Sequence, residues 1–374
     1  MSKRRAAGEG SVFRRRDGRW VAAYIGLAND GTQRRKFVYA RTRAEVVERL
    51  QALKRDVSNG IPLPARSVLL SEYLADWLKA ARPSLRPKTY VSYEGVVRLH
   101  ITPILGHVPL ERLTAAHVGA LLERKQTQGL SPRTSRYVGL ILRNALNKAV
   151  RWGLLSRNVA ALVDLPREVH REVRVLSPPE ARRLVDAARG DRLEALWLLS
   201  VSTGLRMGEV LALQWSDVDL DRRELRVTKA LQRVSGRGLM LAETKTRRSR
   251  RTIVLPVAVA EALRWQRTRQ ELEGIDSGFV FTSSRGTPID GRDLGRSFRR
   301  LLQRADITKM RFHDLRHSCA SLLLAQGISP RVVMETLGHS RIAVTMDTYA
   351  HVMPALQREA ADAMDRLLEP DVGR

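Results

Sequence analysis

The chain has 374 residues, of which 43% are hydrophobic, so it is long enough for two or three folded domains and too apolar to be largely disordered. Lysine and arginine number 66 against 39 acidic residues, a net charge of +27 that predicts a polyanionic partner. We expect nucleic acid rather than a membrane, because the sequence has no apolar run of about 18 residues and no signal-peptide pattern. The single cysteine, Cys319, excludes an internal disulfide and a cysteine-rich zinc site. We therefore expect a cytoplasmic protein.

Residues 1–60 predict a small β-sheet with one helix. The stretch 10–26 reads as strand, turn and strand, with the turn at Asp17-Gly18, and a third strand follows over 35–40. A helix is predicted over 42–60. This unit is too small for a catalytic cleft. Its many arginines favour contact with DNA, and the alternative is a solvated basic surface.

A helical bundle is predicted over residues 68–155. Before it, IPLPARS (61–67) indicates a linker, because two prolines break any helix. Four helices are then predicted: 71–81, 87–105, one capped by Thr114 and ending near Gly129, and one from Pro132 to Trp152. Lysine and arginine side chains should lie on the outside of this bundle.

Residues 170–366 predict a mixed α/β domain. Ser177 and Glu180 form a capping box at its first helix. The expected helices are 178–189, 191–202, one opening near Arg206, 257–272, 291–305, 311–326, 330–337 and one from 343 onward; the expected strands are 224–230, 239–244, 251–255 and 279–281. The fold class expected for the whole chain is therefore mainly α with small β-sheets (α+β).

The stretch STGLRMGEV (202–210) ends one helix and begins the next. Gly204 permits the tight reversal, and Arg206 then falls in the first helical turn, where free backbone amides favour an anion. The Arg206 guanidinium could add a bidentate grip on phosphate oxygens. The alternative is an ordinary ion pair with Glu209.

The stretch TKTRRSRRTIVLP (244–256) is a basic turn that enters a strand. Lys245 stands just before the turn and could project toward a ligand. Lysine can supply a proton, which arginine cannot readily do. The alternative is that all of these basic residues only neutralise the DNA backbone.

The stretch RFHDLRHSCA (311–320) poses a choice between a metal and a phosphate. His313 and His317 are four residues apart, so on a helix both imidazoles could face a zinc ion. A zinc site would need a third ligand, and Arg316 would place a positive charge beside the cation. We therefore favour phosphate.

The stretch LGHSRIAVTMDTYAHV (337–352) supplies the last motif. Gly338 ends a helix, His339 sits in the following turn, and Tyr349 lies on what we expect to be the final helix of the domain. A tyrosine on an amphipathic helix is usually a core or interface residue. The order of the surrounding motifs makes a functional role more plausible.

Together and in this order, these motifs resemble those of the tyrosine recombinase (phage-type integrase) family, over about 170–365. The bundle at 68–155 resembles the core-binding domain of that family, and residues 8–58 more weakly resemble its arm-type DNA-binding domain. The resemblance implies six catalytic residues: Arg206, Lys245, His313, Arg316, His339 and Tyr349. Asp314 and His317 belong to the same motif and are expected to support the helix.

The resemblance implies a site-specific recombinase that cleaves and rejoins DNA. Tyr349 would attack a phosphorus atom to give a 3′-phosphotyrosyl intermediate and release a 5′-hydroxyl. Arg206 and Arg316 would neutralise the nonbridging oxygens, and Lys245 would protonate the leaving oxygen. His313 would transfer a proton with Tyr349, and His339 would donate to the phosphate. Neither a cofactor nor a metal is expected.

The expected partners are double-stranded DNA attachment sites of a phage or other mobile element, bound by a homotetramer. Accessory DNA-bending or directionality proteins are further candidates. The apolar stripe of the tail, at Leu356, Ala360, Met364 and Leu367, would pack onto a neighbouring protomer or fold back on its own domain. The alternative functions are a type IB topoisomerase and a DNA-binding regulator without catalytic activity.

Overall fold

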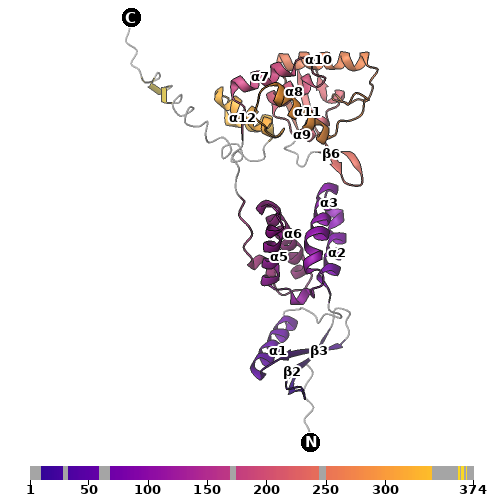
Figure 1. Ribbon diagram of the computed structural model, residues 1–374, viewed down its shortest axis with the longest axis vertical. Coiled ribbons are helices and arrows are strands. Elements are labelled where there is room, and N and C mark those ends of the chain that lie inside the picture. Colours follow the sequence, from indigo (N-terminus) through magenta and orange to yellow (C-terminus); the bar gives the residue numbers. More distant parts are fainter. Residues whose placement is uncertain are drawn as a thin grey trace. The chain divides into compact units, whose positions relative to one another are not determined.

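The computed structural model describes residues 10–27, 33–58, 68–168, 174–243 and 250–338, together with 361, 362, 364, 365 and 368 (Figure 1). The chain divides into two compact units, residues 1–170 and 171–374. Helices predominate in the described ranges and the sheets are small and antiparallel, so the α+β prediction is confirmed. The linker 61–67, Lys245, His339 and Tyr349 lie outside these ranges, as does the tail stripe except for Met364. Of the helix expected from 343 onward, only 361, 362, 364, 365 and 368 are described, and these residues are helical.

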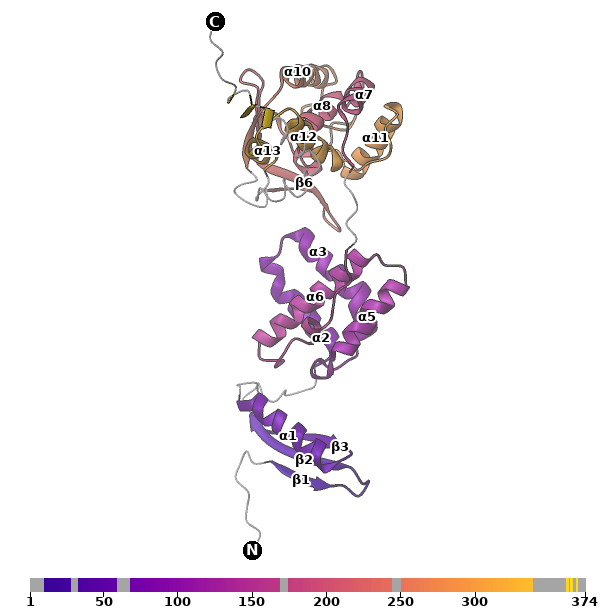
Figure 2. The same ribbon diagram turned by 90° about the vertical axis from the view of Figure 1, so that its left-hand side faces the viewer.

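The first unit begins with the predicted sheet and helix. Its strands β1 (Ser11–Arg14), β2 (Trp20–Leu27) and β3 (Gln33–Ala40) form an antiparallel sheet in that order, and α1 (Arg43–Ser58) lies along it (Figure 2). Ala22 and Tyr24 lie on the same face of β2 and pack with Val46 and Leu50 of α1. Thr42 caps α1, since its Oγ1 accepts from the backbone N–H of Glu45 at 3.2 Å. This segment therefore has a small core of its own.

The helical part of this unit consists of α2 (Leu70–Ala81), α3 (Pro87–Val96), α4 (Thr102–Leu105), α5 (Ala115–Thr127) and α6 (Pro132–Arg151). The caps predicted at the starts of α5 and α6 are present: Thr114 accepts from the backbone N–H of His117, and Ser131 accepts from that of Thr134. The buried hydroxyl of Tyr73 donates to the carbonyl of Ala145 at 2.6 Å, which joins α2 to α6.

The single helix predicted over 87–105 is interrupted. A π-helical turn over Val97–Ile101 separates α3 from α4, and in it the N–H of Thr102 donates to the carbonyl of Val97. Pro103 explains the interruption, because a proline has no N–H and its ring clashes with the carbonyl four residues earlier in a regular helix. The wider turn relieves that clash while the helical path continues.

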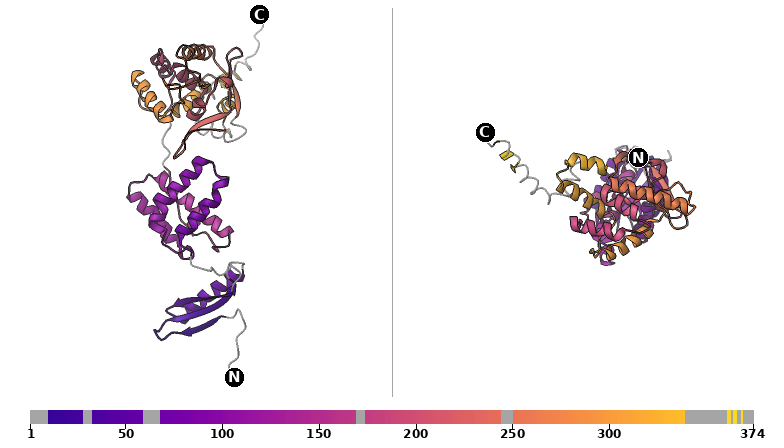
Figure 3. Two further views of the ribbon diagram at one scale, coloured as in Figure 1. Left: turned by 90° about the vertical axis from the view of Figure 1, so that its right-hand side faces the viewer. Right: turned by 90° about the horizontal axis from the view of Figure 1, so that it is seen from above.

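The second unit combines helices with two small sheets, and its β6–β7 hairpin (residues 229–243) projects from the helices (Figure 3). Its helices are α7 (Pro178–Ala188), α8 (Glu194–Thr203), α9 (Met207–Leu211), α10 (Val257–Leu272), α11 (Gly291–Arg304), α12 (Asp314–Ala325) and α13 (Pro330–Leu337). The strands are β4 (Val218–Asp219), β5 (Glu224–Val227) and β8 (Arg251–Val254) in the order β4-β5-β8, and β6 (Lys229–Val234) paired with β7 (Gly238–Glu243). The rings of Trp197, Phe298 and Phe312 meet at centroid distances of 5.7–6.3 Å in the core.

Three predicted elements of this unit differ from the structure. The strand expected over 224–230 is two strands, β5 and β6, which belong to different sheets. The strand expected over 279–281 is only a single bridge, between Gln214 and Phe279. The helix expected from 311 begins at Asp314, because Asp314 folds back on Arg311 in a turn: its backbone N–H donates to the carbonyl of Arg311, and its carboxylate accepts from the N–H of Arg311.

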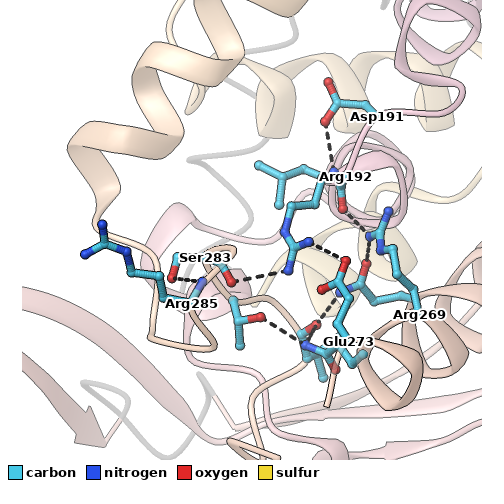
Figure 4. A network of polar contacts seen from close by, with 11 residues as sticks. Asp191, Arg192, Arg269, Glu273, Ser283 and Arg285 are labelled. Carbon is cyan, nitrogen blue, oxygen red and sulfur yellow. Dashed lines mark hydrogen bonds and ion pairs between the residues drawn. The ribbon is translucent and has the colours of Figure 1, made fainter. Parts of the chain in front are cut away.

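A polar network fixes the segment that leads into α8 (Figure 4). The Arg192 guanidinium pairs with Glu273 at 2.6 Å and donates to the carbonyl of Ser283 at 3.2 Å, while Arg269 of α10 donates to the carbonyl of Arg192. These bonds tie the start of α8 to the end of α10 and to the loop at Ser283. The opposite end of α8 leads directly into the candidate site.

Candidate active site

Two helices that end in a left-handed glycine meet at the candidate site. Gly204 ends α8 with φ 61° and Gly338 ends α13 with φ 67°. A Cβ on Gly204 would lie 2.4 Å from Cδ2 of Leu337 and 3.3 Å from Cβ of Cys319. Position 204 therefore needs a glycine both for its backbone conformation and for the close approach of α12 and α13.

Arg206 stands at the N-cap of α9. Its Nη1 lies 2.7 Å from Oε1 of Glu209, and its backbone N–H donates to Oε2 of the same carboxylate at 3.1 Å. The ion pair considered as an alternative to function is thus present. It leaves 38% of the Arg206 side chain exposed, against 4% of Glu209. The ion pair orients the Arg206 guanidinium without burying it, so an anion can still reach the guanidinium.

Glu209 also binds a second arginine, which the sequence analysis did not single out. Nη2 of Arg251 lies 3.0 Å from Oε2 of Glu209, and only 7% of the Arg251 side chain is exposed. Burial favours a higher pKa for Glu209, but Arg251 and then Arg206 outweigh it and hold the pKa below its usual value. The carboxylate is therefore charged at neutral pH. Its two cationic partners satisfy that buried charge.

Arg316 is almost fully buried, with 2% exposure. Its Nη1 donates to the carbonyl of Gly204 at 2.9 Å, and its Nη2 donates to the carbonyl of Leu337 at 2.6 Å. One guanidinium thus joins the reversal before Arg206 to the end of α13. Arg251 contacts the same helix end, because its Nε donates to the carbonyl of Thr336 at 2.7 Å. The last carbonyls of a helix lack intrahelical donors and favour cations, so this helix end suits two buried arginines.

His313 and His317 lie edge to face at the start of α12, with ring centroids 5.2 Å apart. Burial, then the charges of Arg316 and Arg206, lower the pKa of His313. Burial and then His313 lower the pKa of His317 to about 4. Both rings are therefore neutral near pH 7. Asp314 points to Arg311, with which it pairs at 2.7 Å, so it supports the helix start.

The structure brings together three of the six predicted catalytic residues: Arg206, His313 and Arg316. Of the other three, Lys245 follows the end of β7 by two residues, and His339 directly follows Gly338, the C-cap of α13. Within the described ranges, histidine, cysteine and acidic side chains do not gather in any group of three or more that could hold a metal ion. The described residues therefore supply no third zinc ligand beside His313 and His317.

Arg251 could have been singled out from its strand pattern. In β8, Arg251 lies on the same side as the buried Ile253, whereas Thr252 and Val254 are exposed. Four other basic residues precede Arg251 in the same stretch, so the alternation is difficult to recognise in the sequence. An arginine in the inward register of a strand indicates a buried partner, and Glu209 is that partner.

A basic groove of about 1530 Å³ runs along α11 in the same unit. Seven arginines line it: Arg192, Arg233, Arg292, Arg296, Arg299, Arg300 and Arg304. Several of them pair with carboxylates, but the contacts found for Arg299 and Arg300 are a backbone carbonyl and a serine hydroxyl. The groove therefore carries an excess of positive charge.

Among the described residues, no helix combines the length and the apolar character that are needed to span a lipid bilayer.

Comparison with known proteins gives concordant matches. Residues 174–355 match the model of the phage integrase family, and residues 69–125 match that of the phage integrase N-terminal SAM-like domain. The chain is 30% identical over 373 residues to a "Tyrosine recombinase XerC-like" protein of Caldanaerobacter subterraneus subsp. tengcongensis, covering 93% of this chain and 95% of that relative.

Two solved structures share the fold. The Tn1549 transposon integrase, in complex with a circular intermediate DNA, aligns with a TM-score of 0.70 at 23% identity over 80% of this chain and 100% of that one. A lambda integrase tetramer bound to a Holliday junction aligns with a TM-score of 0.59 at 21% identity over 92% of this chain and 96% of that one.

Proposed function

This chain belongs to the phage integrase family of tyrosine recombinases and is a site-specific DNA recombinase, and we propose that six residues carry out its strand cleavage: Arg206, Lys245, His313, Arg316, His339 and Tyr349. The observation that carries this assignment is the meeting of Arg206, at the start of α9, with His313 and Arg316, at the start of α12, more than 100 residues later in the chain. Two arginines and a neutral histidine suit a phosphodiester better than a metal ion.

The proposed reaction begins with attack by the Tyr349 hydroxyl oxygen on a DNA phosphorus. The phenolic proton passes to His313, whose lowered pKa keeps it neutral and able to accept. The bond from phosphorus to the 5′-oxygen breaks, and Lys245 protonates that oxygen. The product is a 3′-phosphotyrosyl link and a free 5′-hydroxyl. Attack by the 5′-hydroxyl of another strand reverses these steps and rejoins the DNA without ATP.

The two arginines would offset the charge of the pentacoordinate phosphorane. Arg206 is half-exposed and held by Glu209, so its guanidinium meets the nonbridging oxygens with little reorganisation. We assign the second contact to Arg316, which is held from within by the carbonyls of Gly204 and Leu337. His339 would donate a further hydrogen bond to the phosphate.

The DNA is proposed to contact all three parts of the chain. Residues 1–60 would bind arm-type sites, residues 68–155 the core site, and residues 170–366 the scissile phosphate. The arginine-lined groove along α11 would take backbone phosphates of the bound DNA. Integration or excision of a mobile element is the reaction that this arrangement supports, and the Tn1549 transposon integrase in complex with its circular intermediate DNA is a precedent.

We propose that the working assembly is a homotetramer on two attachment sites. Recombination exchanges four strands and each protomer supplies one Tyr349, so four protomers are needed. The lambda integrase tetramer on a Holliday junction is a precedent in the same fold. The tail after residue 354 would couple neighbouring protomers. Accessory proteins that bend DNA or set the direction of the reaction are further proposed partners.

The Tyr349→Phe variant tests the proposed function. The variant should bind an attachment-site duplex as the natural protein does but form no covalent adduct with a nicked suicide substrate on a denaturing gel. Tyr93→Phe is a matched control, because Tyr93 belongs to the first unit, where its ring stacks on Trp77, and a phenylalanine keeps that stacking, so the variant should keep the adduct. Adduct formation by Tyr349→Phe would refute the assignment, and plasmid relaxation without strand exchange would favour a topoisomerase.

A further inference from the structure

We propose that Arg251 is a positioning residue for strand cleavage, which aligns Arg206 through Glu209 and fixes the end of α13 with the same guanidinium. This inference rests on the proposed catalytic role of Arg206. It assigns a specific task to one member of a basic stretch whose other residues could act by general attraction to DNA.

The contacts of Arg251 reach two segments that are distant in the sequence. Nη2 lies 3.0 Å from the Glu209 carboxylate, and Nε donates to the carbonyl of Thr336 at 2.7 Å. The guanidinium also lies against the backbone beyond Thr336, because a Cβ on Gly338 would be 3.0 Å from its Nη1. Arg251 thus connects the carboxylate that holds Arg206 to the helix end that precedes His339.

The carboxylate of Glu209 transmits this effect to Arg206. Its Oε1 accepts from the Arg206 guanidinium, and its Oε2 accepts from both the Arg206 backbone N–H and Arg251. These donors fix the plane of the carboxylate. Without Arg251, Oε2 keeps only the backbone N–H of Arg206 as a donor, so the carboxylate is held less firmly. The Arg206 guanidinium then loses its fixed direction, although its own charge is unchanged.

The burial of Arg251 separates this role from ordinary DNA binding. Its side chain is 7% exposed, whereas that of its neighbour Arg250 is 54% exposed and pairs with Glu243. Arg251 therefore cannot place its charge on the DNA backbone without leaving Glu209. A lysine at this position would offer one compact ammonium and could not reproduce the two divergent N–H directions of the guanidinium.

The test compares two substrates, each cleaved under single-turnover conditions. One carries the natural phosphodiester at the cleavage point and the other a neutral methylphosphonate, which needs less charge compensation from Arg206. Arg251→Met should slow cleavage of the phosphodiester by about 100-fold, the scale expected when a catalytic group is misplaced by about 1 Å. On the methylphosphonate, the ratio of the cleavage rate of the natural protein to that of Arg251→Met should be at least about tenfold smaller than on the phosphodiester. Binding of the duplex should be unchanged.

Two further variants keep the result decisive. Arg251→Lys should fold and show the same substrate-dependent defect, which covers the case in which Arg251→Met does not fold. Arg331→Met removes an exposed arginine of α13 that pairs with Glu335 at 3.0 Å, and should cleave both substrates at the natural rate. Equal defects of the Arg251 variants on both substrates, or natural activity of Arg251→Lys, would overturn the proposal. Adduct formation by the natural protein in the same assay shows that the proposed function itself holds.

Discussion

At the scale of single residues, the histidines of α12 show how a cationic site controls protonation. His313 and His317 lie beside arginines and beside each other, and both have a lowered pKa. The neutral form of His313 is the form that can accept a proton from Tyr349. The arginines that would bind the phosphate thus also keep the proposed proton acceptor ready near neutral pH.

We predict that this protonation pattern makes stability fall in acid. The pKa of His317 is about 4 in the folded chain, whereas an unfolded histidine titrates near about 6.5. Between these values the unfolded chain binds a proton that the folded chain does not, so lowering the pH from 7 to 5 favours unfolding. Differential scanning fluorimetry should show a falling Tm over this range, with a shallower slope for His317→Gln.

The control for this prediction is His107→Gln. His107 is exposed in a turn of the helical bundle, so its replacement should leave the slope of Tm against pH unchanged. A His317→Gln variant with the slope of the natural protein would contradict the assignment of the effect to His317.

At the scale of elements, the site is built where helices end rather than along their faces. The end of α8, the start of α9 and the end of α13 meet at the buried guanidinium groups of Arg251 and Arg316. Backbone groups at helix ends have no intrahelical partner, so side chains can pull two such ends together. Small shifts of either end would move Arg206 or the segment that leads to His339.

We predict that Gly204→Ala lowers both stability and cleavage. The left-handed conformation alone costs an alanine about 1–2 kcal/mol, and the new Cβ would also meet Leu337 at 2.4 Å and push α13 away. Gly274→Ala is the matched control, because Gly274 has φ 68° but no heavy atom within 4 Å of the added Cβ. Denaturant unfolding and suicide-substrate cleavage should both show the larger loss for Gly204→Ala. Equal effects of the two variants would mean that the contact with Leu337 is unimportant.

At the scale of the whole molecule, charge rather than a metal is expected to drive the chemistry. Two arginines and a lysine can neutralise and protonate a phosphodiester, and His313 lies beside cations that disfavour a bound metal ion. We predict that covalent adduct formation continues in excess EDTA. Loss of the adduct in EDTA, followed by recovery on addition of zinc, would instead support a zinc site at His313 and His317.

The N-terminal segment should be separable from catalysis. Its core, centred on Ala22, Tyr24, Val46 and Leu50, is distinct from the clusters of the bundle and of the second unit. We predict that a chain lacking residues 1–60 still forms an adduct on a core-site duplex but binds a full attachment site less tightly in a gel-shift assay. If the truncated chain binds the full site as tightly as the intact chain, the arm-binding role is wrong.

The sequence by itself determined the features that depend on near neighbours in the chain. Capping residues Thr114, Ser131 and Ser177 bond to backbone groups three residues away, so their patterns predict the helix starts directly. The fold class and the family motifs were also readable, because residue types at set spacings carry that information. Apolar periodicity alone does not predict the π-helical turn before Pro103, because the apolar pattern continues through that turn unchanged.

Only the tertiary structure decided which buried groups meet. Arg251 contacts Glu209 across 42 residues and Thr336 across 85, and Arg316 contacts Gly204 across 112. In a chain with so many arginines, local patterns cannot select the one that reaches a given carboxylate or carbonyl. The choice depends on how helices and strands pack, and packing joins segments whose separation along the sequence has no fixed spacing.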